Sequence, residues 1–467
     1  MSVVVDATAA VSDMGVERAV DSKYRGSSKN QIFATLFSCL GSLCFGYAVG
    51  YSSPAVPDME WNQVMAADQL AWFSSLLNIG GMIGSFLVGG MLDRFGRKKT
   101  ILLTTIPFIV GWGLITISGS VALFYIGRTL TGVGSGIISA AVAVYITEIS
   151  TSEMRGTLAS CGQLFITIGI LIAYAGGLAL GWKMLALLAV AFPALLILSL
   201  SSMPETPRWL LMNGARNEAK AALSWLRGRH VDVEGELRDI EESINLKEPP
   251  VSLSEFRRPE LKMPLKISLL IALFQQLGGI NAIMFYAVNI MLKAGFKESG
   301  NLAAVIIGAV QVVATVFSVF LMDRLGRRTL LTLGGLTMGL SCTVFGYYFY
   351  SESQSYAWIP LLCVMVYVVG FSLGWGPIPA LVMSELFPVK ARSKASSMTT
   401  LTMWTFSFII TKEFEFMQQV LGKSGVFWFF GSSCFIGVAF ILKYLPETKG
   451  KSLEDIELYF LGKSLRS

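Results

Sequence analysis

The chain has little charge and almost no histidine. Only 15% of its 467 residues are charged, 53% are hydrophobic, and His230 is the single histidine. A soluble domain carries about 25% charged residues, so this chain lacks the polar surface that it would need in water. The net charge of +6 is small and dispersed, which excludes a nucleic-acid-binding protein.

The cysteines offer neither a metal site nor a disulfide framework. All six lie within apolar runs, without CxxC spacing, so we interpret them as small buried side chains. We therefore expect no metal and no other cofactor. The first 29 residues are polar and of mixed charge, and they lack the short apolar core of a cleaved signal peptide.

Long apolar runs are what the chain does have, each close to the about 20 residues that span a bilayer. They predict an all-α, multi-pass membrane protein with twelve transmembrane helices. We predict a tail at 1–30, a six-helix half at 31–202, a helical linker at 203–263, a second six-helix half at 264–445 and a tail at 446–467. The predicted spans are roughly 31–50, 69–92, 99–118, 121–147, 157–180, 183–202, 264–292, 301–322, 329–350, 357–383, 395–417 and 424–445.

The basic residues predict the orientation of these spans. Of the 37 Lys and Arg, 31 lie in or beside the tails, the linker and the connections on the same side. The other connections hold five, and Arg128 lies within a span. By the positive-inside rule, both tails and the linker are expected in the cytoplasm. We expect the plasma membrane, with an internal (lysosomal or vesicular) membrane as the alternative.

Three motifs recur at nearly one offset, close to half the chain length. Asp93–Lys98 returns as Asp323–Arg328, a Glu seven residues before an Arg occurs twice, and Pro204–Thr206 returns as Pro446–Thr448. Such repetition predicts two parallel halves, an arrangement in which transporters place the substrate site between repeats near the midplane.

Seven motifs in order resemble the sugar porter family of the major facilitator superfamily. They are GGMLDRFGRKK (89–99), GRTLTGVGSG (127–136), PETPRWL (204–210), QQLGGIN (275–281), DRLGRR (323–328), GWGPIP (374–379) and PETKGKSLEDIE (446–457). The segment at 50–55 and the short external loops resemble arthropod facilitated trehalose transporters and short-loop glucose transporters. The resemblance implies the major facilitator fold and a small sugar as partner, in a lipid bilayer.

The seventh span supplies the sharpest candidate site. Gln276 and Asn281 would point about 140° apart on a straight helix, but Gly278–Gly279 between them permits a kink or break. Amides suit sugar hydroxyls because each offers donors and an acceptor. The resemblance implies a substrate site of six residues and an external aromatic gate of two. The site residues are Gln163, Gln275, Gln276, Asn281, Gln311 and Trp404, and the gate residues are Phe285 and Tyr286.

Repeated charges at the cytoplasmic ends of the spans predict a second gate. We expect carboxylates and guanidiniums to pair across the two halves when that side is closed. The residues are Asp93, Arg94, Arg97, Glu148, Arg155, Asp323, Arg324, Arg327, Glu385 and Arg392. In addition, Pro377 and Pro379 predict a break and a hinge in the tenth span.

Arg128 is expensive within a bilayer, so it is expected to have a fixed partner, either Glu148 or a helix carbonyl. Direct contact with the substrate is the alternative. Proton-coupled family members carry an Asp in the first span where this chain has Ala48. The sequence thus favours facilitated uniport over a proton–sugar symporter.

Position 380 is the other departure from the family pattern. Ala380 stands where glucose transporters have a Trp that touches the sugar, which predicts a roomier pocket for trehalose or a hexose. An enzyme has little support, because the single histidine, His230, stands in the linker beside Arg229. We do not expect a sugar sensor either, because the tail after 444 is short. The oligomeric state stays open.

Overall fold

The computed structural model describes residues 28–228, 233–245, 253–296, 300–351, 358–449, 456, 459 and 460. His230, the side chain of Asp323 and most of both predicted tails lie outside the described residues. Within the described part, the chain is helical apart from short connections.

The first half of the molecule is a bundle in which helices α2–α9 form six spans. Its helices are α2 (Ser28–Trp61), α3 (Ala67–Phe95), α4 (Arg97–Leu103), α5 (Thr105–Ile117), α6 (Val121–Ile149), α7 (Ser152–Gly176), α8 (Trp182–Ala189) and α9 (Ala191–Leu200). Helices α4 and α5 together form the third span, and α8 and α9 form the sixth. The bundle therefore follows the six predicted spans.

The second half repeats this plan with more interruptions. Its elements are α13 (Pro259–Leu277), α14 (Ile280–Phe285), α15 (Ala287–Lys293), α16 (Gly300–Leu325), α17 (Arg327–Tyr350), α18 (Trp358–Gly370), the π-helix η3 (Phe371–Trp375), α19 (Ile378–Leu386) and α20 (Val389–Tyr444). Eleven helices among the described residues are long and apolar enough to cross a membrane. Because α20 contains two spans that meet at Gly422, the prediction of twelve spans is confirmed.

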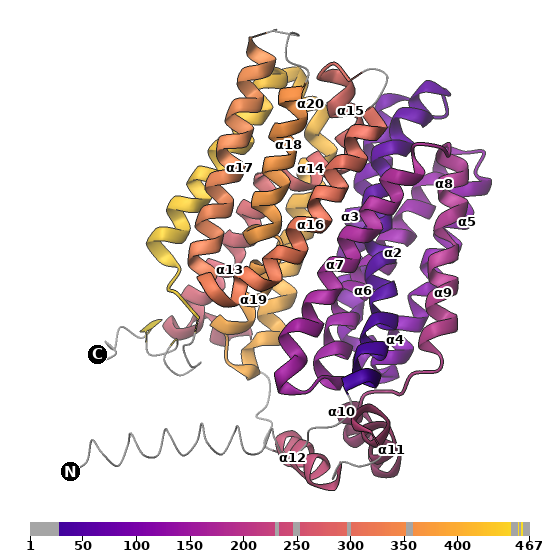
Figure 1. Ribbon diagram of the computed structural model, residues 1–467, viewed down its shortest axis with the longest axis vertical. Coiled ribbons are helices and arrows are strands. Elements are labelled where there is room, and N and C mark those ends of the chain that lie inside the picture. Colours follow the sequence, from indigo (N-terminus) through magenta and orange to yellow (C-terminus); the bar gives the residue numbers. More distant parts are fainter. Residues whose placement is uncertain are drawn as a thin grey trace.

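The polar segment between the halves forms three small helices at one end of the first half (Figure 1). These are α10 (Pro207–Met212), α11 (Arg216–Arg227) and α12 (Val233–Asn245). Arg227 fixes them to the bundle, since it donates to the Ile149 carbonyl at 2.8 Å and pairs with Glu236 at 2.6 Å. We call this end of the molecule the insert end and the opposite end the far end.

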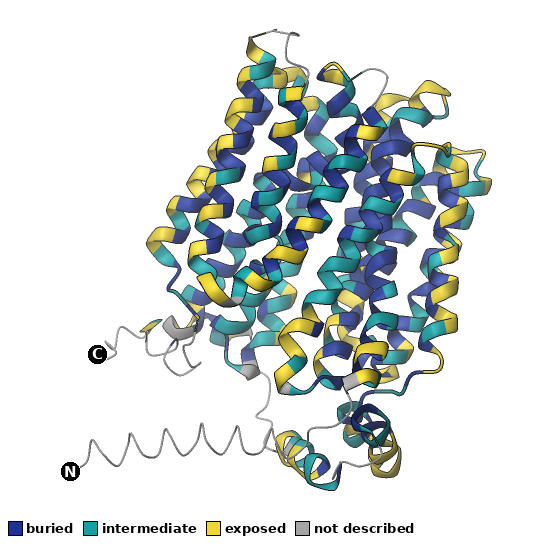
Figure 2. Ribbon diagram, viewed as in Figure 1, coloured by how far each residue is buried: buried dark blue, intermediate teal, exposed yellow. Residues whose placement is uncertain are grey.

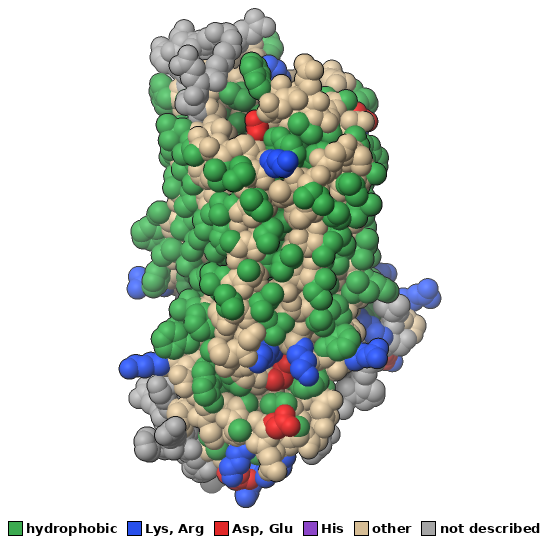
Figure 3. All heavy atoms as spheres, turned by 90° about the vertical axis from the view of Figure 1, so that its right-hand side faces the viewer, with side chains coloured by type: hydrophobic (Ala, Val, Ile, Leu, Met, Phe, Trp, Pro, Cys, Tyr) green, Lys and Arg blue, Asp and Glu red, His purple; other side chains and the backbone are tan. Residues whose placement is uncertain are grey.

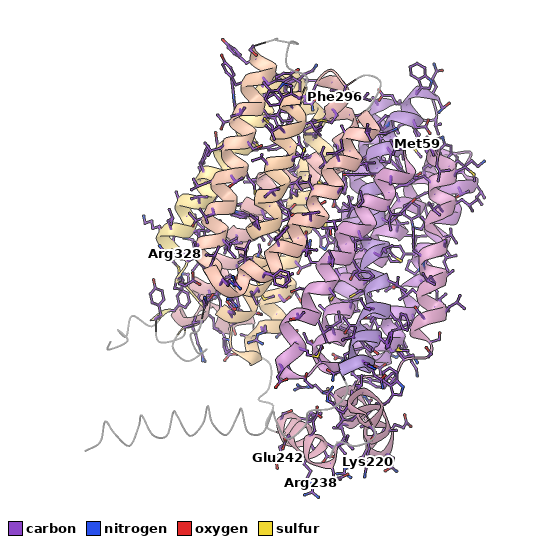
Figure 4. All side chains as sticks on the ribbon, viewed as in Figure 1. Met59, Lys220, Arg238, Glu242, Phe296 and Arg328 are labelled. Atoms are coloured by element: carbon purple, nitrogen blue, oxygen red, sulfur yellow. The ribbon has the colours of Figure 1, made fainter. Side chains whose placement is uncertain are left out.

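Figure 4 shows the two ends, with Met59 and Phe296 at the far end and Lys220, Arg238 and Glu242 on the insert. Buried residues follow the faces along which helices meet (Figure 2). Large apolar side chains such as Phe86, which is 89% exposed, lie on the outside of the bundle. In Figure 3 these side chains cover the middle of the molecule, and Lys and Arg gather toward the insert end. This surface suits a bilayer, which solvates apolar side chains and leaves charged ones at its faces.

Candidate functional site

The seventh span is broken where the glycine pair predicts it. Helix α13 ends at Leu277 and α14 begins at Ile280. Gly279 adopts a φ of +90°, a left-handed conformation that side chains other than glycine rarely adopt. A Cβ atom at Gly279 would also lie 2.4 Å from the ring of Phe430. The break frees backbone groups, and the Gly278 carbonyl accepts a hydrogen bond from the Tyr367 hydroxyl at 2.8 Å.

The break brings the three predicted amides of this span together. Asn281 Nδ2 donates to Gln276 Oε1 at 2.7 Å, and Gln276 Nε2 donates to Gln275 Oε1 at 3.2 Å. Gln275 in turn donates to the Trp375 carbonyl of η3 at 2.5 Å. Gln275 and Gln276 are buried and Asn281 is half-buried, so the amides form one hydrogen-bonded row inside the bundle.

The row continues across to the first half through residues that sequence reasoning missed. Asn281 Nδ2 also donates to Ser407 Oγ on α20 at 2.7 Å, and Ser407 donates to Asn78 Oδ1 on α3 at 2.8 Å. Asn78 Nδ2 then donates to Thr411 Oγ1 at 2.9 Å. A lone Asn inside an otherwise apolar span was the available signal, since buried polar side chains in membranes need partners.

The other two predicted amides lie on α7 and α16, which pack against each other from opposite halves. Gln311 of α16 is buried, and its Oε1 atom has no hydrogen-bond partner among the described residues. One turn away, Gly308 lies against Leu171 and Tyr174 of α7. Gln163 is half-buried on α7, on the insert side of this contact. The structure thus leaves an unsatisfied amide oxygen at the boundary between the halves.

Trp404 is buried on α20, where its indole faces the first half. Its Nε1 donates to Ser85 Oγ at 2.9 Å, and its ring packs directly on Gly81 of α3. Phe45 of α2 lies nearby, with the ring centroids 6.0 Å apart. The predicted aromatic platform therefore lies in the contact between α3 and α20.

The two residues predicted to form an aromatic gate follow the break in the seventh span, on its far-end side. Phe285 and Tyr286 are both fully buried, and Tyr286 stacks on Phe414 with the centroids 5.2 Å apart. Two hydrogen bonds join this segment to the first half: the Tyr174 hydroxyl donates to the Met284 carbonyl at 2.6 Å, and the Val288 amide donates to Ser53 Oγ at 3.0 Å.

Within the described part of the chain, one ion pair also joins the halves at this end. Lys412 of α20 lies 3.6 Å from Asp68 of α3 and over the ring of Trp72, 5.1 Å from its centroid. Because Asp68 is 79% exposed, water screens this pair. The far end is therefore closed mainly by uncharged contacts.

At the insert end, the first half contains a charged cluster. Arg97 pairs with Glu148 at 2.8 Å, within the first half and not across to the second. Thr206 donates to the other carboxylate oxygen of Glu148 at 2.7 Å, and Glu205 accepts from the Arg97 and Lys98 amides at 3.1 and 3.0 Å. The repeated Pro-Glu-Thr motif is thus part of the cluster, a role that sequence reasoning did not assign.

The second half contains the equivalent cluster. Arg327 pairs with Glu385 at 2.9 Å, Thr448 donates to Glu385 at 2.6 Å, and Glu447 accepts from the Arg327 and Arg328 amides at 2.9 and 3.1 Å. In this conformation Arg97 and Arg327 each pair with a carboxylate of their own half, and pairing across the halves when the insert end is closed stays a prediction. Each arginine lies beside the carboxylate of its own half because each half repeats the full motif set.

Apart from Asp323, whose side chain is not described, the remaining predicted gate residues do not join these pairs. Asp93, Arg94, Arg155 and Arg324 are exposed at the insert end. Arg392 is half-buried and donates to the Phe387 carbonyl at 3.2 Å, five residues before it in the chain.

Arg128 is completely buried and has partners in the first span. One guanidinium nitrogen donates to the Ala48 carbonyl at 2.9 Å, and another donates to the Ser52 hydroxyl. The rings of Tyr51 and Phe73 lie 5.8 and 5.4 Å from the guanidinium carbon. Of the expected partners, a helix carbonyl is confirmed and Glu148, which pairs with Arg97, is wrong.

The break in the tenth span is confirmed as well. The span changes from α18 through the π-helix η3 to α19, and Pro377 precedes the first residue of α19. Pro lacks an amide hydrogen and cannot continue the preceding helix without losing a bond.

Taken together, the site residues are amides, hydroxyls and aromatic rings between two bundles. Among the described residues, no group of three His, Cys, Asp or Glu is placed to bind a metal. Such a lining can exchange hydrogen bonds with an uncharged polar molecule.

A family model described as sugar (and other) transporter matches residues 34–460. Facilitated trehalose transporters are similar in sequence: one from Drosophila mojavensis is 39% identical over 449 residues, and one from Aedes aegypti is 40% identical over 449. Each alignment covers 93% of this chain but only 52% and 56% of the relative. The chain therefore spans about half the length of these relatives.

Solved structures of a bacterial transporter share the fold. A partially occluded, inward-open conformation of the xylose transporter XylE from E. coli has a TM-score of 0.80 and 25% identity, covering 91% of this chain and all of that one. The proton:xylose symporter XylE bound to 6-bromo-6-deoxy-D-glucose has a TM-score of 0.76, covering 93% of this chain and all of that one.

Proposed function

Because the chain belongs to the sugar transporter family, we propose that it is a facilitative carrier that moves a small sugar down its gradient by alternating access. Its relatives and its fold are those of membrane sugar transporters of the major facilitator superfamily and not of enzymes. In the proposed cycle, the two halves rock about a central site, so that the far end and the insert end open in turn.

The sugar binds between the halves, at the amide row of α13 and α14. Gln275, Gln276 and Asn281 are already joined to one another, and their hydrogen bonds can be exchanged for sugar hydroxyls. Gln311, with an unpartnered buried oxygen, contributes an acceptor from α16. Gln163 and Trp404 complete the proposed site from α7 and α20. Uncharged side chains bind the sugar without the strong attraction of a charged group, which would slow the release of the sugar.

The environment of Arg128 is the observation that carries the proposal of uniport. Its guanidinium donates to the carbonyl of residue 48, the position at which proton-coupled family members have an aspartate. Here residue 48 is a buried alanine, and the other partners are a serine hydroxyl and two rings. A proton relay needs a group that titrates near neutral pH, and none of these partners of Arg128 is a carboxylate or a histidine.

The substrate is proposed to be trehalose, a glucose-type hexose, or both. Residue 380 in the broken tenth span is an alanine, whose small side chain supports a wider pocket than a tryptophan there would leave. The names of the relatives, facilitated trehalose transporters, point in the same direction.

In the proposed orientation, the insert end and both tails lie in the cytoplasm, at the plasma membrane. The gathering of basic side chains at the insert end supports this orientation. The structure then corresponds to the carrier with its external gate closed, and Phe285 and Tyr286 form that gate. The charged clusters lie beside the cytoplasmic gate.

A proton-coupled symporter is the second candidate, because the similar structures are those of XylE, described as a proton:xylose symporter. Net uptake into sugar-free proteoliposomes separates the two. A uniporter should only equilibrate labelled sugar across the membrane, and neither an imposed proton gradient nor a protonophore should change the final level. Accumulation that depends on an imposed proton gradient would support the symporter instead. Labelled trehalose and labelled glucose, compared in parallel, identify the substrate.

A further inference from the structure

Asn78 is the most deeply buried amide that connects the two halves. It lies on α3, its side chain is 1% exposed, and both of its hydrogen bonds reach α20 of the other half. Its Nδ2 donates to Thr411 Oγ1 at 2.9 Å, while its Oδ1 accepts from Ser407 Oγ at 2.8 Å. Thr411 and Ser407 are four residues apart on α20, so they present their hydroxyls on one face of that helix.

The same serine contacts the amide row in the broken seventh span. Ser407 Oγ accepts from Asn281 Nδ2 at 2.7 Å, and Asn281 Nδ2 also donates to Gln276. The Ser407 hydroxyl therefore donates its proton to Asn78 and accepts a hydrogen bond from Asn281. Both donor positions of Asn281 are occupied, which leaves its Oδ1 atom as the group offered to a ligand.

Along the contact between α3 and α20, the bonds of Asn78 lie in the middle, in the part that must separate when the far end opens. Toward the far end lie Trp72 and Lys412, and toward the insert end lies the packing of Trp404 on Gly81. Separation of the halves at the far end would break both bonds of Asn78 at once. A buried amide that loses its partners is costly until water or a ligand replaces them.

We propose that Asn78 is a positioning residue that keeps the far end closed and, through Ser407, orients the Asn281 amide toward the sugar. The inference rests on the proposed function in that Asn281 is taken to bind the sugar. The proposal adds a contact from the first half to the site. Through this contact, closure of the far end and orientation of the Asn281 amide occur together. Opening of the far end breaks the bond from Ser407 to Asn78, so the Ser407 hydroxyl is free to rotate and holds the Asn281 amide less firmly.

The first test measures closure without any sugar. Spin labels at Trp61 on α2 and Val420 on α20, both exposed at the far end, report the separation of the halves. In Asn78→Leu, which removes both bonds at similar volume, the ratio of open to closed far ends should rise about tenfold, as expected for the loss of one to two buried hydrogen bonds. Thr411→Val, which is nearly isosteric, should raise it in the same direction and remains informative if Asn78→Leu does not fold.

Ser135→Ala is the matched control. Ser135 is a buried serine that donates only to Thr131 of its own helix, so its loss should leave the ratio unchanged. The double variant Asn78→Leu with Thr411→Val should exceed Asn78→Leu by little, because the two residues share a bond. An unchanged ratio in Asn78→Leu and Thr411→Val would overturn the proposal, and so would an equal change in Ser135→Ala.

The second test concerns the orientation of Asn281. Sugar affinity is measured for Asn78→Leu, for Asn281→Ala and for both together. If Asn78 acts through Asn281, the combined loss should be smaller than the product of the single losses by at least about twofold. If the losses of sugar affinity in Asn78→Leu and Asn281→Ala simply multiply in the double variant, Asn78 does not act through Asn281. Failure of the wild-type protein to bind any sugar would contradict the proposed function, whereas the label distances would still decide whether Asn78 closes the far end.

Discussion

The two ends of the molecule keep their helices together by different means. At the insert end, Arg97–Glu148 and Arg327–Glu385 are short, mostly buried ion pairs, and each lies within one half. At the far end, the contacts between the halves are uncharged hydrogen bonds, ring contacts and one exposed ion pair. Strong pairs thus stabilise each half as a rigid body, and weaker contacts join the halves where a carrier must open and close.

Breaking a charged cluster should have the largest effect. Glu148→Ala leaves the buried Arg97 guanidinium and the Thr206 hydroxyl without their partner, so the free energy of unfolding should fall by about 3 kcal/mol. Glu385→Ala should behave alike in the second half. Thermal unfolding in detergent measures the change, with the exposed Arg94→Ala as control. Melting temperatures that match the wild type would show that the clusters do not stabilise the halves.

Removal of an amide from the site should affect transport while the protein still folds and inserts into the membrane. Gln276→Ala deletes the acceptor of Asn281 and a proposed sugar ligand, so counterflow should fall at least about tenfold. Gln419→Ala, an exposed glutamine on α20, is the control. Unaltered counterflow in Gln276→Ala would remove the seventh span from the site.

The ion pair between the halves should contribute little. Asp68→Asn removes the partner of Lys412, yet exposed pairs have small effects, so counterflow should change by less than about twofold. A tenfold change would mean that the far end is closed by charge, which would erase the contrast between the two ends.

The smallest effect is expected in the insert. Hydrogen bonds from Arg216 and Lys220 lower the pKa of Glu234 to about 2 from the usual 4.5. A carboxyl group with a lowered pKa stabilises the folded state above its ordinary pKa, and this contribution is lost as pH falls from 4.5 toward 2. Arg216→Ala should therefore increase hydrogen exchange in α11 and α12 at neutral pH but not in the spans. If hydrogen exchange in α11 and α12 still differs between Arg216→Ala and the wild type at pH 2, the effect does not come from the pairing of Arg216 with ionised Glu234.

The sequence alone predicted the features that repeat or that break a helix. The glycine pair at 278 and 279 predicted the interrupted seventh span, and the motif offsets predicted two like halves. The partners of Arg97 could not be chosen from sequence, because each half offers an equivalent carboxylate and the spacing does not say which is nearer. Asn78 and Ser407 could not be assigned from sequence, because the role of a single polar residue in a span depends on which residue of the other half lies opposite to it.

The most direct test of the account compares label distances across and within the halves, with and without sugar. One pair joins Trp61 and Val420 across the far end, and the other joins Lys99 and Thr147, both exposed at the insert end of the first half. If the halves move as units, sugar should shift the Trp61–Val420 distance between two populations while the Lys99–Thr147 distance keeps a single value. A Lys99–Thr147 distance that splits in step with sugar, or a Trp61–Val420 distance that never changes, would contradict this expectation.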